Sequence, residues 1–328
     1  MKFLIAGLGS IGRRHLKNLL ELGQEDIILY RTHQGTLGDD GLQRFQEEND
    51  IKKALSHKPD AVIISNPSAL HMDVAVPAAQ IGCALFIEKP LASAPDDLQQ
   101  FESIITKMGN IVFSAFQFRF NPGLRKIDQL INEKRLGNPI SFDCHWGEYL
   151  PDWHPWEDYR KSYSANIALG GGVVRTLCHP FDYLRWLFGE PCKLFAVTGN
   201  ASNLELDVED FAEVIINFNN DITGHLHLDY YRRPVRHDLE ITCTDGVLFW
   251  DHAKSDVRVK KADRSEETFT APEGFERNHM FLDEMRHFIN LVEGKERKVC
   301  DFSDGKKALQ ISTAVLQSGR YKQPVIFD

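Results

Sequence analysis

The chain has 328 residues, of which 47 are acidic and 38 basic, giving a formal net charge of −9. This balance disfavours nucleic acid or an anionic membrane surface as the main partner, so a small molecule is expected. The length exceeds that of a usual single core and predicts two domains. Six scattered cysteines without C-x-x-C spacing indicate reduced thiols, and no stretch is apolar enough to span a bilayer. We therefore expect a soluble cytoplasmic protein with no membrane partner.

The first thirty residues predict a strand, a glycine turn and a helix. A short apolar run leads into the sequence GLGSIG, and apolar residues at helical spacing follow it. The first glycine of such a turn makes the bend, the second lets a pyrophosphate approach, and the third lets the helix pack on the strand. The turn predicts a dinucleotide site at the helix N-terminus, formed by Gly7, Gly9, Ser10, Ile11 and Gly12. An incidental glycine-rich turn is the alternative.

The end of the second predicted strand bears on the choice of cofactor. NAD sites usually place an acid there for the ribose 2′-hydroxyl, but Arg31 follows the strand Asp26–Tyr30 and no acid is adjacent. Arg31 could meet the 2′-phosphate of NADP, so the sequence favours NADP slightly over NAD. A solvated arginine just past a strand is the alternative.

Strands and helices alternate through the first 120 residues, and this order predicts a parallel sheet with crossover helices. The expected helices are Leu42–Glu48, Ile51–His57, Met72–Ile81 and Asp96–Lys107, and the expected strands are Ala61–Ser65, Ala84–Ile87 and Ile111–Ala115. Ligands of such sheets bind beyond the carboxyl ends of the strands. Lys89 stands at one of these ends, where an ammonium could polarise a hydroxyl or carbonyl. A strand-end lysine that reaches solvent is the alternative.

The second half predicts a different architecture, in which alternating runs and turn signals indicate antiparallel strands. After a helix over Leu124–Leu136, the expected strands are Pro139–Tyr149, Leu194–Val197, Phe211–Asn217, Ile222–Tyr231, His237–Thr242, Val247–Asp251 and Val257–Lys260. Helices over Met280–Val292 and Gly305–Ser318 and a strand over Val325–Phe327 complete the chain. The predicted fold class is α/β: a doubly wound Rossmann domain over 1–121, and an α+β domain with a large, mostly antiparallel open sheet over 122–328. A return of the last residues to the first domain is left open.

Two segments interrupt the predicted second sheet. The loop Trp146–Arg160 is dense in aromatic and charged side chains, which suits stacking on and hydrogen bonding to a sugar ring. Its candidate substrate-binding residues are Tyr149, Trp153, His154 and Arg160; packing on its own domain or on a neighbouring subunit is the alternative. A glycine-led helix then begins after Gly172 and carries His179 and Asp182 on one face.

Three of these motifs together resemble the Gfo/Idh/MocA oxidoreductase family: the glycine turn, the Glu88-Lys89-Pro90 triplet and the glycine-led helix. The resemblance spans nearly the whole chain. It implies a Rossmann domain and a C-terminal domain with an open sheet. It also implies NAD(P)-dependent hydride transfer at a hydroxyl or keto carbon of a sugar, sugar derivative or polyol. Members commonly pair through the exposed sheet face, so a homodimer or homotetramer is expected.

The resemblance also assigns roles to particular residues. It implies that Lys89 and His179 are catalytic and that Asp182 orients the histidine or supports its helix. Lys89 and His179 would also contact the substrate, for which Arg119 and Arg175 are further candidates. The remaining cofactor-binding candidates are Asn66, Pro67, His71, Glu88 and Lys89.

One departure from the family concerns the position four residues before His179, where many members carry an aspartate and this chain carries Arg175. The mechanism could rely on Lys89 and His179 alone, or Glu148 or Asp152 could substitute. Alternatively the protein is a sensor or regulator that binds cofactor without turnover. Arg175 favours an anionic substrate.

Two further motifs are not explained by the resemblance to the family. His225 and His227 share a strand face, but the sequence shows no third convergent ligand, so no metal is expected. The basic run Tyr231–His237 could grip a carboxylate or phosphate, although a solvated strand end is the commoner explanation.

Overall fold

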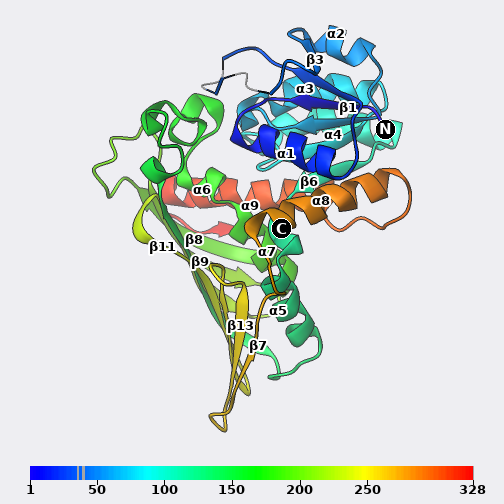
Figure 1. The fold of residues 1–328 in the computed structure, drawn as a ribbon. Coiled ribbons are helices and arrows are strands. Elements are labelled where there is room, and N and C mark those ends of the chain that lie inside the picture. Colours follow the sequence, from blue (N-terminus) through cyan, green and yellow to red (C-terminus); the bar gives the residue numbers. More distant parts are fainter. Residues whose placement is uncertain (35–36, 39–40, 328) are drawn as a thin grey trace. The chain divides into compact units, whose positions relative to one another are not determined.

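The computed structural model describes residues 1–34, 37–38 and 41–327 and divides into two compact units (Figure 1). The first unit comprises Met1–Gln117, Ala168–Gly170 and Arg277–Leu309. The second comprises Phe118–Ile167, Gly171–Glu276 and Gln310–Asp328. The sequence-based boundary after residue 121 stays a prediction. In the described part of the chain, no helix is both long and apolar enough to cross a membrane.

Within its described residues, the first unit contains a six-stranded parallel sheet in the order β3-β2-β1-β4-β5-β6. The strands are β1 (Phe3–Ala6), β2 (Ile27–Tyr30), β3 (Gln46–Glu48), β4 (Ala61–Ile64), β5 (Ala84–Glu88) and β6 (Val112–Ala115). Its α-helices are α1 (Ser10–Glu21), α2 (Ile51–Ser56), α3 (His71–Gln80), α4 (Gln99–Met108), α8 (Arg277–Val292) and the part of α9 (Phe302–Tyr321) up to Leu309. This is the predicted doubly wound Rossmann sheet, and the prediction is confirmed.

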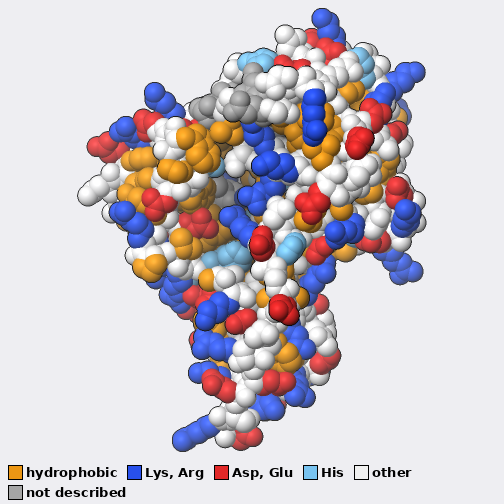
Figure 2. Space-filling view, viewed as in Figure 1, with side chains coloured by type: hydrophobic (Ala, Val, Ile, Leu, Met, Phe, Trp, Pro, Cys, Tyr) orange, Lys and Arg blue, Asp and Glu red, His pale blue; other side chains and the backbone are white. Residues whose placement is uncertain are grey.

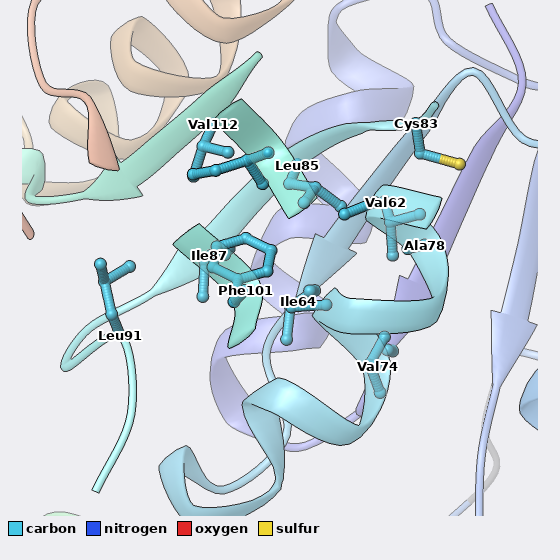
Figure 3. Close-up of a cluster of buried hydrophobic side chains, with 14 of the residues drawn as sticks. Val62, Ile64, Val74, Ala78, Cys83, Leu85, Ile87, Leu91, Phe101 and Val112 are labelled. Atoms are coloured by element: carbon cyan, nitrogen blue, oxygen red, sulfur yellow. The ribbon is translucent and has the colours of Figure 1, made fainter. Parts of the chain in front are cut away.

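The central strands of this unit have continuous apolar sequences because they lie in its buried core. Val62 and Ile64 of β4 and Leu85 of β5 are fully buried, and they meet Val74 of α3 and Phe101 of α4 (Figure 3). Strands of a parallel sheet that is covered by crossover helices bury both faces. The buried side chains of β4 and β5 therefore form part of the core of the first unit.

The predicted helix over Leu42–Glu48 is wrong, because residues Gln46–Glu48 form strand β3 instead. Ile28 to Tyr30 of β2 pair in parallel with these three residues, from Gln46 to Glu48. Gln and Glu favour helices in isolation, but backbone pairing at the sheet edge outweighs that weak preference. An edge strand with polar side chains carries no apolar period that could have revealed it.

The second unit contains a nine-stranded sheet within its described residues, in the order β14-β13-β12-β11-β7-β10-β9-β8-β15. Its strands are β7 (Pro139–Tyr149), β8 (Pro191–Gly199), β9 (Phe211–Phe218), β10 (Thr223–Asp229), β11 (Tyr231–Cys243), β12 (Gly246–Asp251), β13 (Asp256–Lys261), β14 (Glu266–Phe269) and β15 (Val325–Ile326). β7 pairs with β10 in parallel, and the other neighbours pair antiparallel. The prediction of a large, mostly antiparallel sheet is confirmed.

One face of this sheet packs on helices, and the other face is open. Leu194 and Ala196 of β8 are buried, whereas Phe195 and Val197 between and after them are exposed. The helices of the unit are α5 (Pro122–Asn132), α6 (Val173–Thr176), α7 (His179–Phe188) and the second half of α9 (Phe302–Tyr321). Basic and acidic side chains intermingle where β7 and β13 lie, at the bottom of the view in Figure 2.

The predicted glycine-led helix is divided into α6 and α7. Pro180 lies in the first turn of α7, where its missing N–H is tolerated. In a continuous helix the carbonyl of Thr176 would accept from the N–H of residue 180, which proline lacks. The first helix, α6, therefore ends at Thr176, and α7 begins at His179. The break fixes His179 as the first residue of α7.

Candidate functional site

In the glycine turn of the first unit, neighbouring atoms leave no room for a side chain at two of the glycines. At the third glycine, the described residues leave room for one. Gly7 has φ +92°, and a Cβ on it would lie 2.5 Å from the backbone nitrogen of Asn66. A Cβ on Gly12 would collide with the carbonyl oxygen of Gly7. Among the described residues, no atom lies within 4 Å of a Cβ built on Gly9, and no side chain caps α1, which begins at Ser10. The backbone N–H groups at this turn are therefore suited to donate hydrogen bonds to phosphate oxygens.

The loop after β4 supports this turn through hydrogen bonds. Ser65 Oγ lies 2.9 Å from the carbonyl oxygen of Gly7, to which it donates. His71 is buried, with Nε2 2.9 Å from the carbonyl of Asn66 and Nδ1 3.2 Å from that of Leu91. Burial lowers the pKa of His71, which favours a neutral ring. These contacts give His71 a positioning role that ties the loops after β4 and β5 together.

Glu88 ends β5 and pairs with a histidine that the sequence analysis did not identify. His15 of α1 is buried, and its Nε2 lies 2.8 Å from Glu88 Oε1. Burial alone would raise the pKa of Glu88, but the hydrogen bond from His15 and the nearby charge of Lys89 lower it on balance. The available signal was a histidine on the buried face of a helix, which implies a buried polar partner.

Lys89 follows Glu88 at the carboxyl end of β5 and is partly buried. Its backbone N–H donates to Glu88 Oε2 at 3.2 Å, and its peptide bond to Pro90 is cis. β1, which leads into the glycine turn, and β5 both pair with β4, so their carboxyl ends lie at one edge of the sheet. The buried Glu88 and His15 pair thus anchors the backbone from which the Lys89 side chain extends.

At the end of β2, the structure brings an acid to Arg31 that is distant in sequence. Arg31 is largely buried, and its Nη1 donates to Glu47 Oε2 at 3.0 Å. His33 Nε2 lies 2.6 Å from the other oxygen of the same carboxylate. Glu47 belongs to β3, so the error in predicting that segment as a helix concealed this ion pair.

In the second unit, Arg119 and Asp182 form a bidentate ion pair. Arg119 donates from Nε and Nη2 to the two carboxylate oxygens of Asp182, at 2.7 and 2.8 Å. Both side chains are buried, and the guanidinium lies 5.2 Å from the ring centre of Trp186. Asp182 and Arg119 are therefore joined to each other, which links the start of this unit to α7.

His179 begins α7 inside a cluster of aromatic rings. The Trp146 ring stacks on it at 5.5 Å between ring centres and 25° between planes, and Phe118 meets it edge-on at 4.9 Å. Trp146 also stacks on His237 at 4.2 Å. The imidazole is 1% exposed, so its orientation is fixed by packing.

A carboxylate that the sequence analysis did not consider lies beside α6. Glu209 Oε1 accepts a hydrogen bond from the backbone N–H of Val174 at 3.1 Å. Burial raises the pKa of Glu209, and the charge of Arg175 opposes that rise. Glu209 belongs to the loop before β9, so no motif connects it with the glycine-led segment. It supplies an acid close to the position where the family aspartate is missing.

The aromatic loop is held mainly by contacts within its own unit. Trp153 meets Tyr230 edge-on at 5.6 Å, and the Arg233 guanidinium lies 3.6 Å from the ring centre of Tyr149. Arg160 is half exposed and donates to Asp158 at 2.9 Å, while the His154 ring lies 4.9 Å from that of Trp156. The basic run after Tyr231 forms the start of β11, and its five residues from Arg232 to Arg236 line a cavity of about 380 Å³.

Comparison with known families gives two adjacent matches. Residues 1–116 match the "Oxidoreductase family, NAD-binding Rossmann fold", and residues 124–249 match the "GFO/IDH/MocA C-terminal domain". Together they cover more than half of the chain.

Relatives of similar length match almost end to end. A myo-inositol 2-dehydrogenase of Thermotoga maritima is 26% identical over 99% of this chain and 98% of its own. A scyllo-inositol 2-dehydrogenase (NAD(+)) of Bacillus subtilis is 24% identical over 99% of this chain and 95% of its own.

Among solved structures, levoglucosan dehydrogenase in complex with NADH and levoglucosan superposes with a TM-score of 0.88, at 19% identity over 99% of both chains. The WlbA dehydrogenase from Bordetella pertussis, in complex with NADH and UDP-GlcNAcA, gives 0.83 at 19% identity, over 100% of this chain and 99% of that one. These likenesses show the same fold. With both family domains matched in sequence, the chain belongs to the Gfo/Idh/MocA oxidoreductase family.

Proposed function

We propose that the protein is an NAD(P)-dependent dehydrogenase or reductase acting on a hydroxyl or keto carbon of a sugar, sugar derivative or polyol. The observation that carries the proposal is Lys89, held by the buried Glu88 and His15 pair at the sheet edge that bears the glycine turn. The names of the relatives, which are inositol dehydrogenases, support the substrate class.

The residues of the first unit fit a dinucleotide. Open space at Gly9 and an uncapped α1 suit a pyrophosphate, while Ser65 and His71 hold the neighbouring loops in place. The nicotinamide, when bound, would supply or accept the hydride. We assign Gly7, Gly9, Ser10, Ile11 and Gly12 to the phosphates. Asn66, Pro67 and Glu88 would shape the same edge.

Lys89 and His179 are proposed to handle the proton and the charge at the substrate oxygen. The Lys89 ammonium stabilises negative charge as it develops there, and the imidazole of His179 accepts or donates the proton. Asp182 then acts as a positioning residue: its ion pair with Arg119 holds the helix that begins at His179.

Glu209 is proposed to supply the carboxylate that the position of Arg175 lacks. Its raised pKa moves it toward the range of a general acid or base. Glu209→Gln should therefore alter the pH profile of kcat while leaving the Kd for NADH unchanged. If the profile of Glu209→Gln superposes on that of the wild type, the assignment fails. The substrate contacts proposed alongside it are Arg175, Tyr149, Trp153, His154 and Arg160.

The cofactor is proposed to be NAD in preference to NADP. The sequence alone favoured NADP through Arg31, but the Glu47 carboxylate accepts from that guanidinium and balances its charge. The 2′-phosphate of NADP would therefore meet an arginine that is already paired with Glu47, and the Glu47 carboxylate would repel it.

The oligomer is proposed to form through the open face of the second sheet. Phe195 and Val197 of β8 and Ile215 of β9 are between 38% and 50% exposed there, and Phe195 is the register partner of Ile215. A contiguous exposed apolar patch of this kind is typical of an association surface.

The proposed function is tested by incubating the full chain with NAD(+) or NADP(+) and a panel of inositols, levoglucosan and UDP-linked uronic sugars. The absorbance of the reduced nicotinamide reports turnover. We expect turnover with at least one polyol or sugar, and a loss of about 100-fold or more in Lys89→Met with unchanged cofactor binding. Lys53→Met, an exposed lysine of α2, is the matched control. Tight cofactor binding with no turnover on any substrate would instead support the sensor.

A further inference from the structure

Histidines and carboxylates gather on the open face of the nine-stranded sheet, on three adjacent strands. They are Asp143 and His145 of β7, Glu213 of β9, and His225, His227 and Asp229 of β10. The pairing register explains the cluster: His225 lies opposite Asp143, and His227 lies opposite both His145 and Glu213. The parallel pairing of β7 with β10 joins residues about 80 positions apart.

Three of these side chains bring potential metal-ligand atoms close to one another. Asp143 Oδ1 lies 3.0 Å from His225 Nδ1, and Asp143 Oδ2 lies 3.1 Å from His145 Nε2. The potential ligand atoms of the three residues all lie within 4.8 Å of one another. The sequence displayed two histidines with no third ligand, and the sheet register brings in His145 and Asp143.

Both ring nitrogens of His225 lie against carboxylate oxygens. Its Nε2 lies 2.7 Å from Glu213 Oε2, and its Nδ1 faces Asp143. A neutral imidazole carries one N–H, so donation to Glu213 leaves the Nδ1 lone pair facing a carboxylate. The space between the Nδ1 atom and the Asp143 carboxylate is thus a place where a metal ion could bind.

We propose that Asp143, His145 and His225 form a binding site for a divalent transition metal of the Zn²⁺ type. Two imidazoles and one carboxylate are a ligand set that Zn²⁺ accepts, with water completing a tetrahedron. In many metal sites a carboxylate hydrogen-bonds to a metal-bound histidine, which orients the ring and fixes its tautomer. Glu213 would have this role for His225. The site lies wholly within the second unit and requires no hydride transfer, so it stands or fails separately from the proposed dehydrogenase activity.

The site is tested with the full chain stripped by a chelator and dialysed against Zn²⁺, followed by elemental analysis. We expect one Zn²⁺ per chain in the wild type and none in Asp143→Asn or His225→Gln. Glu213→Gln should bind about 10- to 100-fold more weakly, because its hydrogen bond orients His225. The matched control is His57→Gln, which removes a half-exposed histidine that pairs with a carboxylate, Glu48, in the first unit.

Substitution with Co²⁺ provides a second readout, since a tetrahedral site with two nitrogen ligands gives visible absorption bands. The imidazole NMR signals of the wild-type protein provide a further test. This test does not depend on the folding of any variant. Zn²⁺ should shift the signals of two histidines and suppress their titration. Substoichiometric binding, equal binding by Asp143→Asn, or histidine signals that titrate unchanged in Zn²⁺ would each overturn the proposal in favour of a protonated His225.

Discussion

At the scale of single residues, side chains that are distant in sequence decide the chemistry. Arg31 looked available for a phosphate, yet Glu47 holds it at 3.0 Å. Asp182 was expected to orient His179 or support its helix, and the structure shows that it also accepts from Nε and Nη2 of Arg119. Both partners come from other elements, so no local spacing in the sequence could have revealed them.

Removing the carboxylate beside Arg31 should change the preference for cofactor. Glu47→Gln removes a negative charge beside the guanidinium, so NADPH should bind more tightly and NADH about as before, as measured by fluorescence titration of both. Glu48→Gln is the matched control, since the neighbouring carboxylate pairs with His57 instead. An unchanged ratio of the two Kd values in Glu47→Gln would show that Arg31 does not read the 2′ position.

Breaking the buried ion pair of the second unit should cost stability first. Asp182→Asn leaves the Arg119 charge buried without its counter-ion, so urea unfolding should show a loss of about 3–5 kcal/mol. Asp158→Asn, whose partner Arg160 is half exposed, should change little. A fully stable Asp182→Asn protein with strongly reduced kcat would contradict the positioning role and favour a direct catalytic one.

At the scale of elements, apolar period and glycine punctuation predicted most strands and helices well. β7 begins and ends where the sequence indicated, because its side chains alternate between a buried and an open face. Strand β3 was not predicted, because its residues are polar and its strand conformation depends on pairing with β2. The division into α6 and α7 was missed because Pro180 was compatible both with a continuing helix and with a new first turn.

The glycine turn offers a test in which two similar substitutions should behave differently. Gly12→Ala forces a Cβ against the Gly7 carbonyl, so the protein should unfold at a lower Tm. Gly9→Ala meets no atom of the residues that the structure describes and should keep the wild-type Tm, but its methyl group should obstruct the pyrophosphate and weaken NADH binding. Unaltered NADH affinity in a folded Gly9→Ala protein would place the phosphates elsewhere.

At the scale of the whole molecule, the sequence predicted both architectures and the family, since the glycine turn, the Glu88-Lys89-Pro90 triplet and the glycine-led segment are each local. Sites built by register were not predictable. Glu209 and the cluster around Asp143 depend on which strands become neighbours, and β7 and β10 pair across about 80 intervening residues.

The central claim, proposed above, is that Lys89 and His179 both take part in hydride transfer by this chain. A double-mutant cycle in single-turnover hydride transfer, with the best substrate of the panel, tests it most directly. We predict that Lys89→Met and His179→Gln each lower the rate by about 100-fold or more, and that the double variant is little slower than the worse single one. Undiminished rates in either single variant, or losses that multiply in the double variant, would contradict the claim.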